Sequence, residues 1–130
     1  MLPLFGNFHQ LRESLYLYKV NKGIFTELKS LLNPPQNVKD TMDAVCLLFG
    51  RKSDWIEAKK LMADSNFHNL VNNYDTDKIP VDALKTIREG YLKDPEASYE
   101  SMLKKSRSGA IMCRWVHEIS EYEKNRKENS

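Results

Sequence analysis

The stretch 33-NPPQNVKDTMDAVCLLFG-50 opens with two prolines, closes with a glycine and carries one amphipathic segment between them. Its apolar residues recur every three or four positions, which is typical of one side of a helix. They are Val38, Met42, Val45, Cys46 and Phe49. A residue before proline is pushed out of the helical region, so the preceding element should end at Asn33. Pro35 suits the first turn of the new helix and Gly50 its end, so the stretch predicts a buried helix after a sharp corner.

Short helices separated by turns are predicted on both sides of this corner. Upstream, Phe25 to Leu32 reads as a helix with Leu28, Leu31 and Leu32 on one side. Downstream, the pattern predicts helices at 54–63 with an Asp54 cap, at 66–74, from Pro80 with Leu84, Ile87 and Tyr91, and from about Ser98 to the end. No segment alternates like a strand. The fold class is therefore all-α, a small bundle of about six short helices.

The composition is typical of one globular domain. The chain has 130 residues, 41% of them hydrophobic and 29% charged, which is enough to bury a core without disulfides. The formal net charge is only +2, so an electrostatic partner must be met by a local patch. Cys46 and Cys113 have no metal-ligand spacing and are expected to be reduced, buried thiols of an intracellular protein. Neither a signal peptide nor a membrane span is predicted.

No catalytic, cofactor or metal site is predicted. The segment 75-DTDKIPVDALK-85 has acidic residues where a calcium loop begins, but Ile79 and Pro80 occupy positions that need a ligand and a glycine. A helix-capping turn explains this segment better. The three histidines are scattered and the glycines stand singly, so neither a catalytic triad nor a phosphate-binding loop is indicated. We expect no enzymatic activity from this chain.

The last predicted helix carries a row of basic residues. Lys104, Arg107 and Arg114 are spaced i, i+3 and i+10, with Ile111 between them, so they should share one face. A helix that is apolar inside and basic outside suits docking onto an acidic surface. Four further lysines could extend the patch, namely Lys29, Lys39, Lys59 and Lys60. A basic row is also common on a plain solvated helix, so the spacing alone leaves both interpretations open.

Four segments together carry a more specific pattern. They are 21-NKGIFTELKSLLNPPQNVKDTMDAVCLLFG-50, 54-DWIEAKKLMADSNF-67, 74-YDTDKIP-80 and 105-KSRSGAIMCRWVHEISEY-122. In this order they resemble the microtubule-binding domain at the tip of the dynein heavy-chain stalk. The run of Cys113, Arg114, Trp115 and Val116, followed by an acidic helix, is more similar to axonemal than to cytoplasmic members.

The resemblance implies a function. In that family a small helical bundle binds α/β-tubulin in microtubules, the double proline marks the end of the first stalk strand, and the last helix leaves as the second strand. The contact residues implied at matching positions are Glu27, Lys29, Lys39, Lys59, Lys60, Glu100, Lys104 and Arg107. The ATPase motor lies elsewhere in a heavy chain, so the resemblance implies no cofactor here. It implies a place on the cytoskeleton, in the cytoplasm and in the axoneme of cilia.

The resemblance also implies three parts. Residues 1–22 would be a divergent lead in place of the first stalk strand, because Pro3 and Gly6 interrupt any heptad. Residues 23–116 would be the microtubule-binding domain, and 117–130 the truncated start of the second, coiled-coil strand. Asp64 replaces an arginine of cytoplasmic members, so weaker or altered docking is expected. The alternatives are a helical module for another acidic protein or, less favoured by the low net charge, for nucleic acid.

Overall fold

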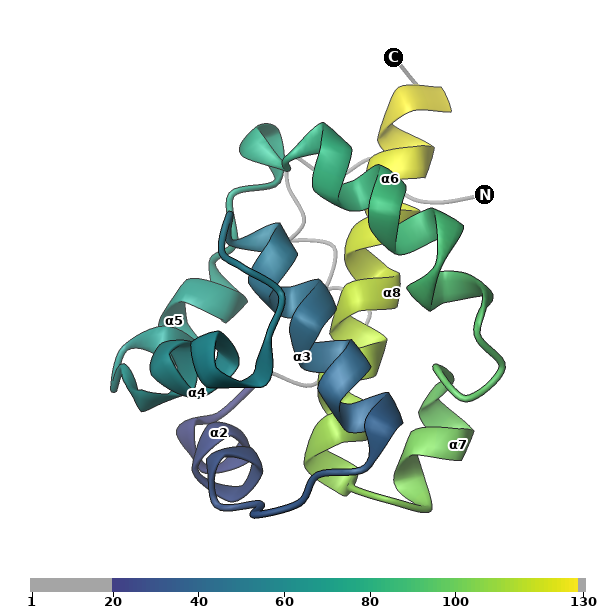
Figure 1. Ribbon diagram of the computed structural model, residues 1–130. Helices are drawn as coiled ribbons and strands as arrows, with labels where there is room; N and C mark the ends of the chain where they lie inside the picture. Colours follow the sequence, from purple (N-terminus) through teal and green to yellow (C-terminus); the bar gives the residue numbers. More distant parts are fainter. Residues whose placement is uncertain (1–19, 129–130) are drawn as a thin grey trace.

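The computed structural model describes residues 20–128, with side chains as far as Arg126, and these residues form a bundle of helices (Figure 1). The helices are α2 (Lys22–Lys29), α3 (Gln36–Leu48), α4 (Trp55–Ala63), α5 (Phe67–Asn72), α6 (Val81–Glu89), α7 (Tyr99–Leu103) and α8 (Arg107–Glu128). Two short 3-10 helices, η1 (Thr76–Lys78) and η2 (Tyr91–Lys93), flank α6. No strand occurs within residues 20–128, which confirms the all-α class.

The predicted corner is present at the start of α3. Pro34 is buried, Pro35 caps the helix, and its carbonyl accepts from the Val38 amide at 3.0 Å. At the other end Gly50 has a φ of 71°, a left-handed conformation that glycine adopts without strain. This lets the Arg51 amide turn back to the Cys46 carbonyl at 2.9 Å, which satisfies the end of the helix.

The first helix lies earlier in the chain than predicted. It runs from Lys22 to Lys29 and not from Phe25 to Leu32. Asn21 starts it, because its side chain accepts from the Ile24 amide at 3.2 Å. Ser30 follows the last helical residue, and its hydroxyl donates to the Glu27 carbonyl at 2.6 Å, a contact that competes with helix continuation. Leu32 is consequently outside the helix and fully exposed.

Two predicted helices are divided. The helix expected from Ser98 to the end is α7 and α8, separated at residues 104–106. Ser106 causes the break, because its hydroxyl oxygen accepts from the Gly109 amide at 2.9 Å and its carbonyl from the Ala110 amide at 2.9 Å, as at a helix N-terminus. In the fifth helix, Gly90 ends α6, so Tyr91 falls in η2.

An aromatic row runs through the core. The rings of Phe25 and Phe67 lie 4.8 Å apart, those of Phe67 and Phe49 5.2 Å, and Phe49 stacks on Trp115 at 6.1 Å. Tyr74 meets Trp115 edge-on at 5.4 Å. These residues come from α2, the end of α3, α5, the segment after α5 and α8, so the row ties distant segments into one core.

α3 and α8 form the centre of the bundle. In Figure 1 both begin at the lower end and run upward, with α2, α4 and α5 on one side and α6 and α7 on the other. α8 packs against α2, α3 and α7. Its last turns project from the bundle at the upper end (Figure 1). Within residues 20–128, no helix combines the length and apolarity that a bilayer crossing needs.

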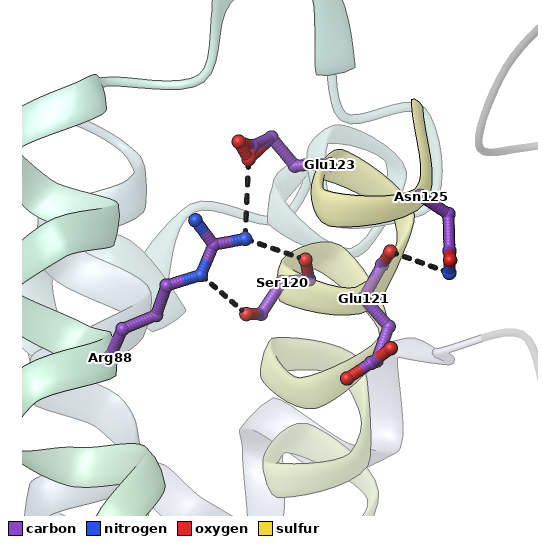
Figure 2. Close-up of polar contacts among 5 residues, drawn as sticks. All are labelled: Arg88, Ser120, Glu121, Glu123 and Asn125. Atoms are coloured by element: carbon purple, nitrogen blue, oxygen red, sulfur yellow. Dashed lines mark hydrogen bonds and ion pairs between the residues drawn. The ribbon is translucent and has the colours of Figure 1, made fainter. Parts of the chain in front are cut away.

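Arginine contacts hold the upper half of α8 in place. Arg88 of α6 donates from Nε to the Ser120 hydroxyl at 3.0 Å and from Nη2 to the Ser120 carbonyl at 2.8 Å (Figure 2). The same nitrogen lies 3.2 Å from Glu123 Oε2. One turn further, Arg126 lies 2.6 Å from Asp77 Oδ1 of η1. These contacts fix the direction in which α8 leaves the bundle.

Candidate docking surface

Four elements meet at the lower end of the bundle, opposite to the projecting end of α8 (Figure 1). They are α2, the start of α3, α7 and the first turn of α8. Gly109 marks the point of closest approach, because a Cβ there would lie 2.9 Å from Met102 Cε of α7 and 3.2 Å from Val38 Cγ2 of α3. We call this region the basic end, after Lys29, Lys39, Lys104, Lys105 and Arg107, which lie on these elements and the α7–α8 turn.

The predicted row of basic residues on one helix is wrong. Lys104 caps the end of α7 and only Arg107 and Arg114 belong to α8, so helical spacing does not relate all three. Arg114 faces α7, where its guanidinium lies 3.9 Å above the Tyr99 ring. Ile111 is half-buried and packs against the core. Three exposed cations, Lys104, Lys105 and Arg107, are instead grouped at the α7–α8 turn.

Glu27 links two elements of the basic end. Its Oε2 accepts a hydrogen bond from the Ser108 hydroxyl at 2.8 Å, which ties α2 to the first turn of α8. Ser108 is buried, with 4% of its surface exposed, whereas Glu27 is exposed. One carboxylate oxygen is therefore engaged within the domain, and the same residue can also face solvent or a partner.

Lys29 and Lys39 flank the double proline. Lys29 is the last residue of α2, where a positive charge is favoured by the helix dipole. Lys39 lies in the first turns of α3, just after the corner. Both side chains are half-buried, so their aliphatic stems lie against the bundle. The structure thus places one lysine on either side of the corner.

Lys59 and Lys60 lie on α4, which packs against α2. Both are exposed, but Lys60 Nζ lies 3.9 Å from Glu57 Oε2, and the other oxygen of Glu57 binds Arg51 at 3.0 Å. Asp54 starts α4 by accepting from the Glu57 amide at 2.7 Å, as its cap position predicted.

The remaining predicted positions also lie at the surface. Glu100 is exposed on α7. Asp64 is exposed at the end of α4 and accepts from the Asn66 amide at 2.8 Å, so it shapes the turn into α5. Six of the eight implied contact residues lie on the elements and the turn that meet at the basic end, and Lys59 and Lys60 lie beside them on α4.

Both cysteines lie in the interior of the bundle. Cys46 and Cys113 are free and buried, and burial raises the pKa of Cys46 to about 12. Burial likewise raises the pKa of Cys113, so both thiols are neutral at physiological pH and poor nucleophiles. Among the described residues, no group of three or more His, Cys, Asp or Glu side chains is placed to hold a metal ion.

Two cavities lie on the α6 side. One of about 560 Å³ lies between η1, α6 and α8 and is lined by Ile79, Val81, Leu84 and the arginines Arg88 and Arg126. Another of about 280 Å³ lies between α3 and α6. Neither includes a residue of the basic end. Lys104, Lys105 and Arg107 are exposed, and an exposed charged surface suits a macromolecular partner better than a small ligand.

Comparison with known proteins shows the family and the fold. The family model of the microtubule-binding stalk of dynein motors matches residues 11–125. The chain belongs to this family. A solved structure of the microtubule-binding domain of dynein-C superposes with a TM-score of 0.71 at 26% identity, covering 93% of this chain and 83% of that one.

Heavy chains of both dynein classes are relatives of this dynein stalk chain. The dynein-1-beta heavy chain of the flagellar inner arm I1 complex of Chlamydomonas reinhardtii is 34% identical over 103 residues, and the cytoplasmic heavy chain of Dictyostelium discoideum 35% over 99. Axonemal heavy chain 6 of Homo sapiens is 32% identical over 101 residues. These matches cover 79%, 75% and 78% of this chain, respectively, but only 2% of each relative.

Sequence reasoning missed two features of the basic end. Helical spacing does not group Lys105 with Lys104, because a continuous helix would turn the two side chains in different directions. The turn between α7 and α8 exposes both. Ser108 was missed because its partner, Glu27, is 81 positions away in the chain. The sequence did hold a signal for the turn, since serine is a preferred residue at the start of a helix.

Proposed function

We propose that this dynein stalk chain is a docking module that binds α/β-tubulin in microtubules reversibly and through charge. The observation that carries the proposal is the group of exposed cations at the α7–α8 turn, Lys104, Lys105 and Arg107. This turn lies at the end opposite to the projecting helix (Figure 1). A docking module at the tip of a stalk needs this layout, with the contact surface at one end and the stalk at the other. The acidic surface of tubulin supplies the complementary charge.

Several weak contacts would make the docking fast and reversible. Exposed ion pairs each contribute about 0–1 kcal/mol and are screened within roughly 8–10 Å at physiological salt. The cationic surface is extended by four further lysines, Lys29, Lys39, Lys59 and Lys60. The negative charges of Glu27 and Glu100 reduce its attraction to an acidic partner. Affinity should therefore fall steeply as salt rises. Asp64, in place of an arginine of cytoplasmic relatives, removes one attraction beside this surface.

The chain would act as part of a larger motor. We propose that it has no catalytic activity of its own, that an ATPase motor elsewhere in a heavy chain drives it, and that it meets the rest of a dynein complex through that chain. Residues 23–116 would form the docking domain and 117–130 the start of the second stalk strand. The lead proposed for 1–22 lies, up to residue 19, outside the described residues. We place the protein on the cytoskeleton, in the cytoplasm and in ciliary axonemes.

Co-sedimentation with stabilised microtubules across a salt series tests the proposal. The variant is Lys104→Glu and the matched control is Lys85→Glu, an exposed lysine on α6 away from the basic end. We expect the parent and the control to pellet alike at low salt. Reversing one contact charge should weaken binding by about tenfold, because it turns one attraction into a repulsion.

Two further samples make the result decisive. The chain is also tested with both ends joined to a coiled coil of fixed register, so that a need for the stalk is separated from a lack of binding. DNA of matched charge density tests the nucleic-acid alternative. Three results would each contradict the proposal. They are failure of the parent to pellet both with and without the coiled coil, equal loss of binding in the two lysine variants, and equal binding of the parent to DNA and to microtubules.

A further inference from the structure

One fully exposed leucine lies at the basic end. Among the described residues, Leu32 has 100% of its surface exposed, more than Val81 at 72% or Leu103 at 44%. It lies in the loop between α2 and α3, which runs along the lower end of the bundle in Figure 1. Single exposed apolar side chains are common on protein surfaces. The neighbours of Leu32 are what make its exposure informative.

The loop on both sides of Leu32 is anchored. The Leu31 amide donates to the Leu28 carbonyl at 3.2 Å, and the Leu31 side chain packs against the core. On the other side Pro34 is buried, and Pro35 is joined to α3 through its carbonyl. Leu32 is therefore held away from the domain by residues that are themselves fixed. A side chain presented on a fixed loop loses little conformational entropy on binding.

Basic residues share this end of the bundle with Leu32. Lys29 precedes it by three positions, and Lys104, Lys105 and Arg107 lie at the α7–α8 turn, at the same end of the bundle. Leu103, the last residue of α7, adds a second, partly exposed apolar side chain beside those cations. An apolar contact inside a ring of charge is the common arrangement of a protein–protein interface.

We propose that Leu32 is an apolar anchor of the docking surface and is buried against tubulin when the basic end binds. This inference rests on the proposed function and adds a part of the binding free energy that does not depend on salt. The cations of the basic end attract the domain to the microtubule and set the salt dependence of its affinity. Leu32 contributes through burial, which salt does not screen.

The alternatives fit less well. A second copy of this chain would carry the same cations on the same face, and like charges would oppose one another across the contact. One leucine is also far below the roughly 1,200–2,000 Å² that a stable interface buries, so it needs the charged contacts around it. Tubulin, with an acidic surface, allows the apolar and the charged contacts to form together.

The experiment is the same salt series with three new variants. Leu32→Ser removes the anchor, Leu32→Met retains it, and Val81→Ser removes an exposed valine on α6 as a matched control. We expect Leu32→Ser to lower affinity by about tenfold at every salt concentration, as burial of a leucine side chain would require. The plot of log affinity against log salt should shift downward without a change of slope.

Each result decides the matter. Leu32→Met should bind as the parent does, and Val81→Ser should have no effect, while Lys104→Glu should flatten the slope. Normal binding by Leu32→Ser, or equal losses in Leu32→Ser and Val81→Ser, would overturn the inference while leaving the proposed function intact. Absence of parent binding in both forms tested above would overturn the proposed function and this inference with it. Melting temperatures should not differ, because Leu32 makes no contribution to the core.

Discussion

Asp43 is a carboxylate in an unfavourable place. It lies half-buried on α3, facing the cavity between α3 and α6. Burial, together with the negative charges of Asp40 and Asp54, raises its pKa from 3.8 to about 6, against a smaller opposing effect of Lys39. The folded state thus binds this proton more tightly than the unfolded state does. The ionised form at neutral pH costs stability.

Asp43→Asn should stabilise the protein at neutral pH. Because the folded pKa is raised, the stability linked to this group is fully present below about pH 4 and is lost as pH rises to about 6. The asparagine does not ionise, so it should raise the free energy of unfolding by about 1 kcal/mol near pH 7.5, allowing for partial exposure. Near pH 4 the variant and the parent should melt alike.

Thermal unfolding at the two pH values measures this effect. Glu96→Gln is the control, since this side chain is exposed and its neutralisation should change little at either pH. A gain of stability that is the same near pH 4 and pH 7.5 would show that packing, and not ionisation of Asp43, is responsible.

At the scale of elements, α2 depends on its neighbours. It has eight residues, too few for an isolated helix to be stable in water. Ile24, Phe25 and Leu28 are buried against the bundle, and the Ser108–Glu27 hydrogen bond ties it to α8. The position of Lys29, at the end of α2, is therefore set by contacts with a segment distant in sequence.

Ser108→Ala should loosen α2. The variant removes the 2.8 Å bond and leaves the exposed Glu27 to water, so we expect a loss of about 1 kcal/mol. Amide hydrogen exchange should become faster in residues 22–29 and stay unchanged in α6. Ser53→Ala, at an exposed position before α4, serves as the control. Unchanged exchange in α2 would mean that its apolar face alone determines its position.

At the scale of the whole molecule, α8 connects the two ends. Its first turn lies against α2, α3 and α7 at the basic end, and its upper half is bound by Arg88 and Arg126 (Figure 2). Trp115, fully buried between these points, joins it to the aromatic row. The helix is thus attached to the bundle at several levels along its length.

Arg88→Ala should free the upper half of α8. The variant loses two hydrogen bonds to Ser120 and the ion pair with Glu123, so we expect a loss of about 1–3 kcal/mol. Hydrogen exchange should become faster from about residue 118 onward, while α2 and α7 stay protected. Lys85→Ala on the same helix is the control. Equal acceleration throughout the domain would indicate global destabilisation and not a local attachment.

Local features of the chain determined most of the elements. Pro34, Pro35 and Gly50 set the limits of α3, and Asp54 starts α4, because these effects act within one helical turn. The all-α class and the family pattern could also be predicted, since both depend on spacing along the chain. The break at Ser106 was within reach of the same rules, but the apolar periodicity on both sides of it favoured one long helix.

The arrangement of the candidate site was decided by tertiary structure. Periodicity placed Lys104 and Arg114 on one helix and Leu32 on one side of a helix with Leu28 and Leu31. The fold placed Lys104 on a turn, Arg114 against Tyr99 and Leu32 in solvent. Helical spacing describes a face only as long as the helix continues. Which surface becomes buried, and which distant side chain Glu27 or Ser120 meets, depends on how the helices pack, and no local pattern encodes that packing.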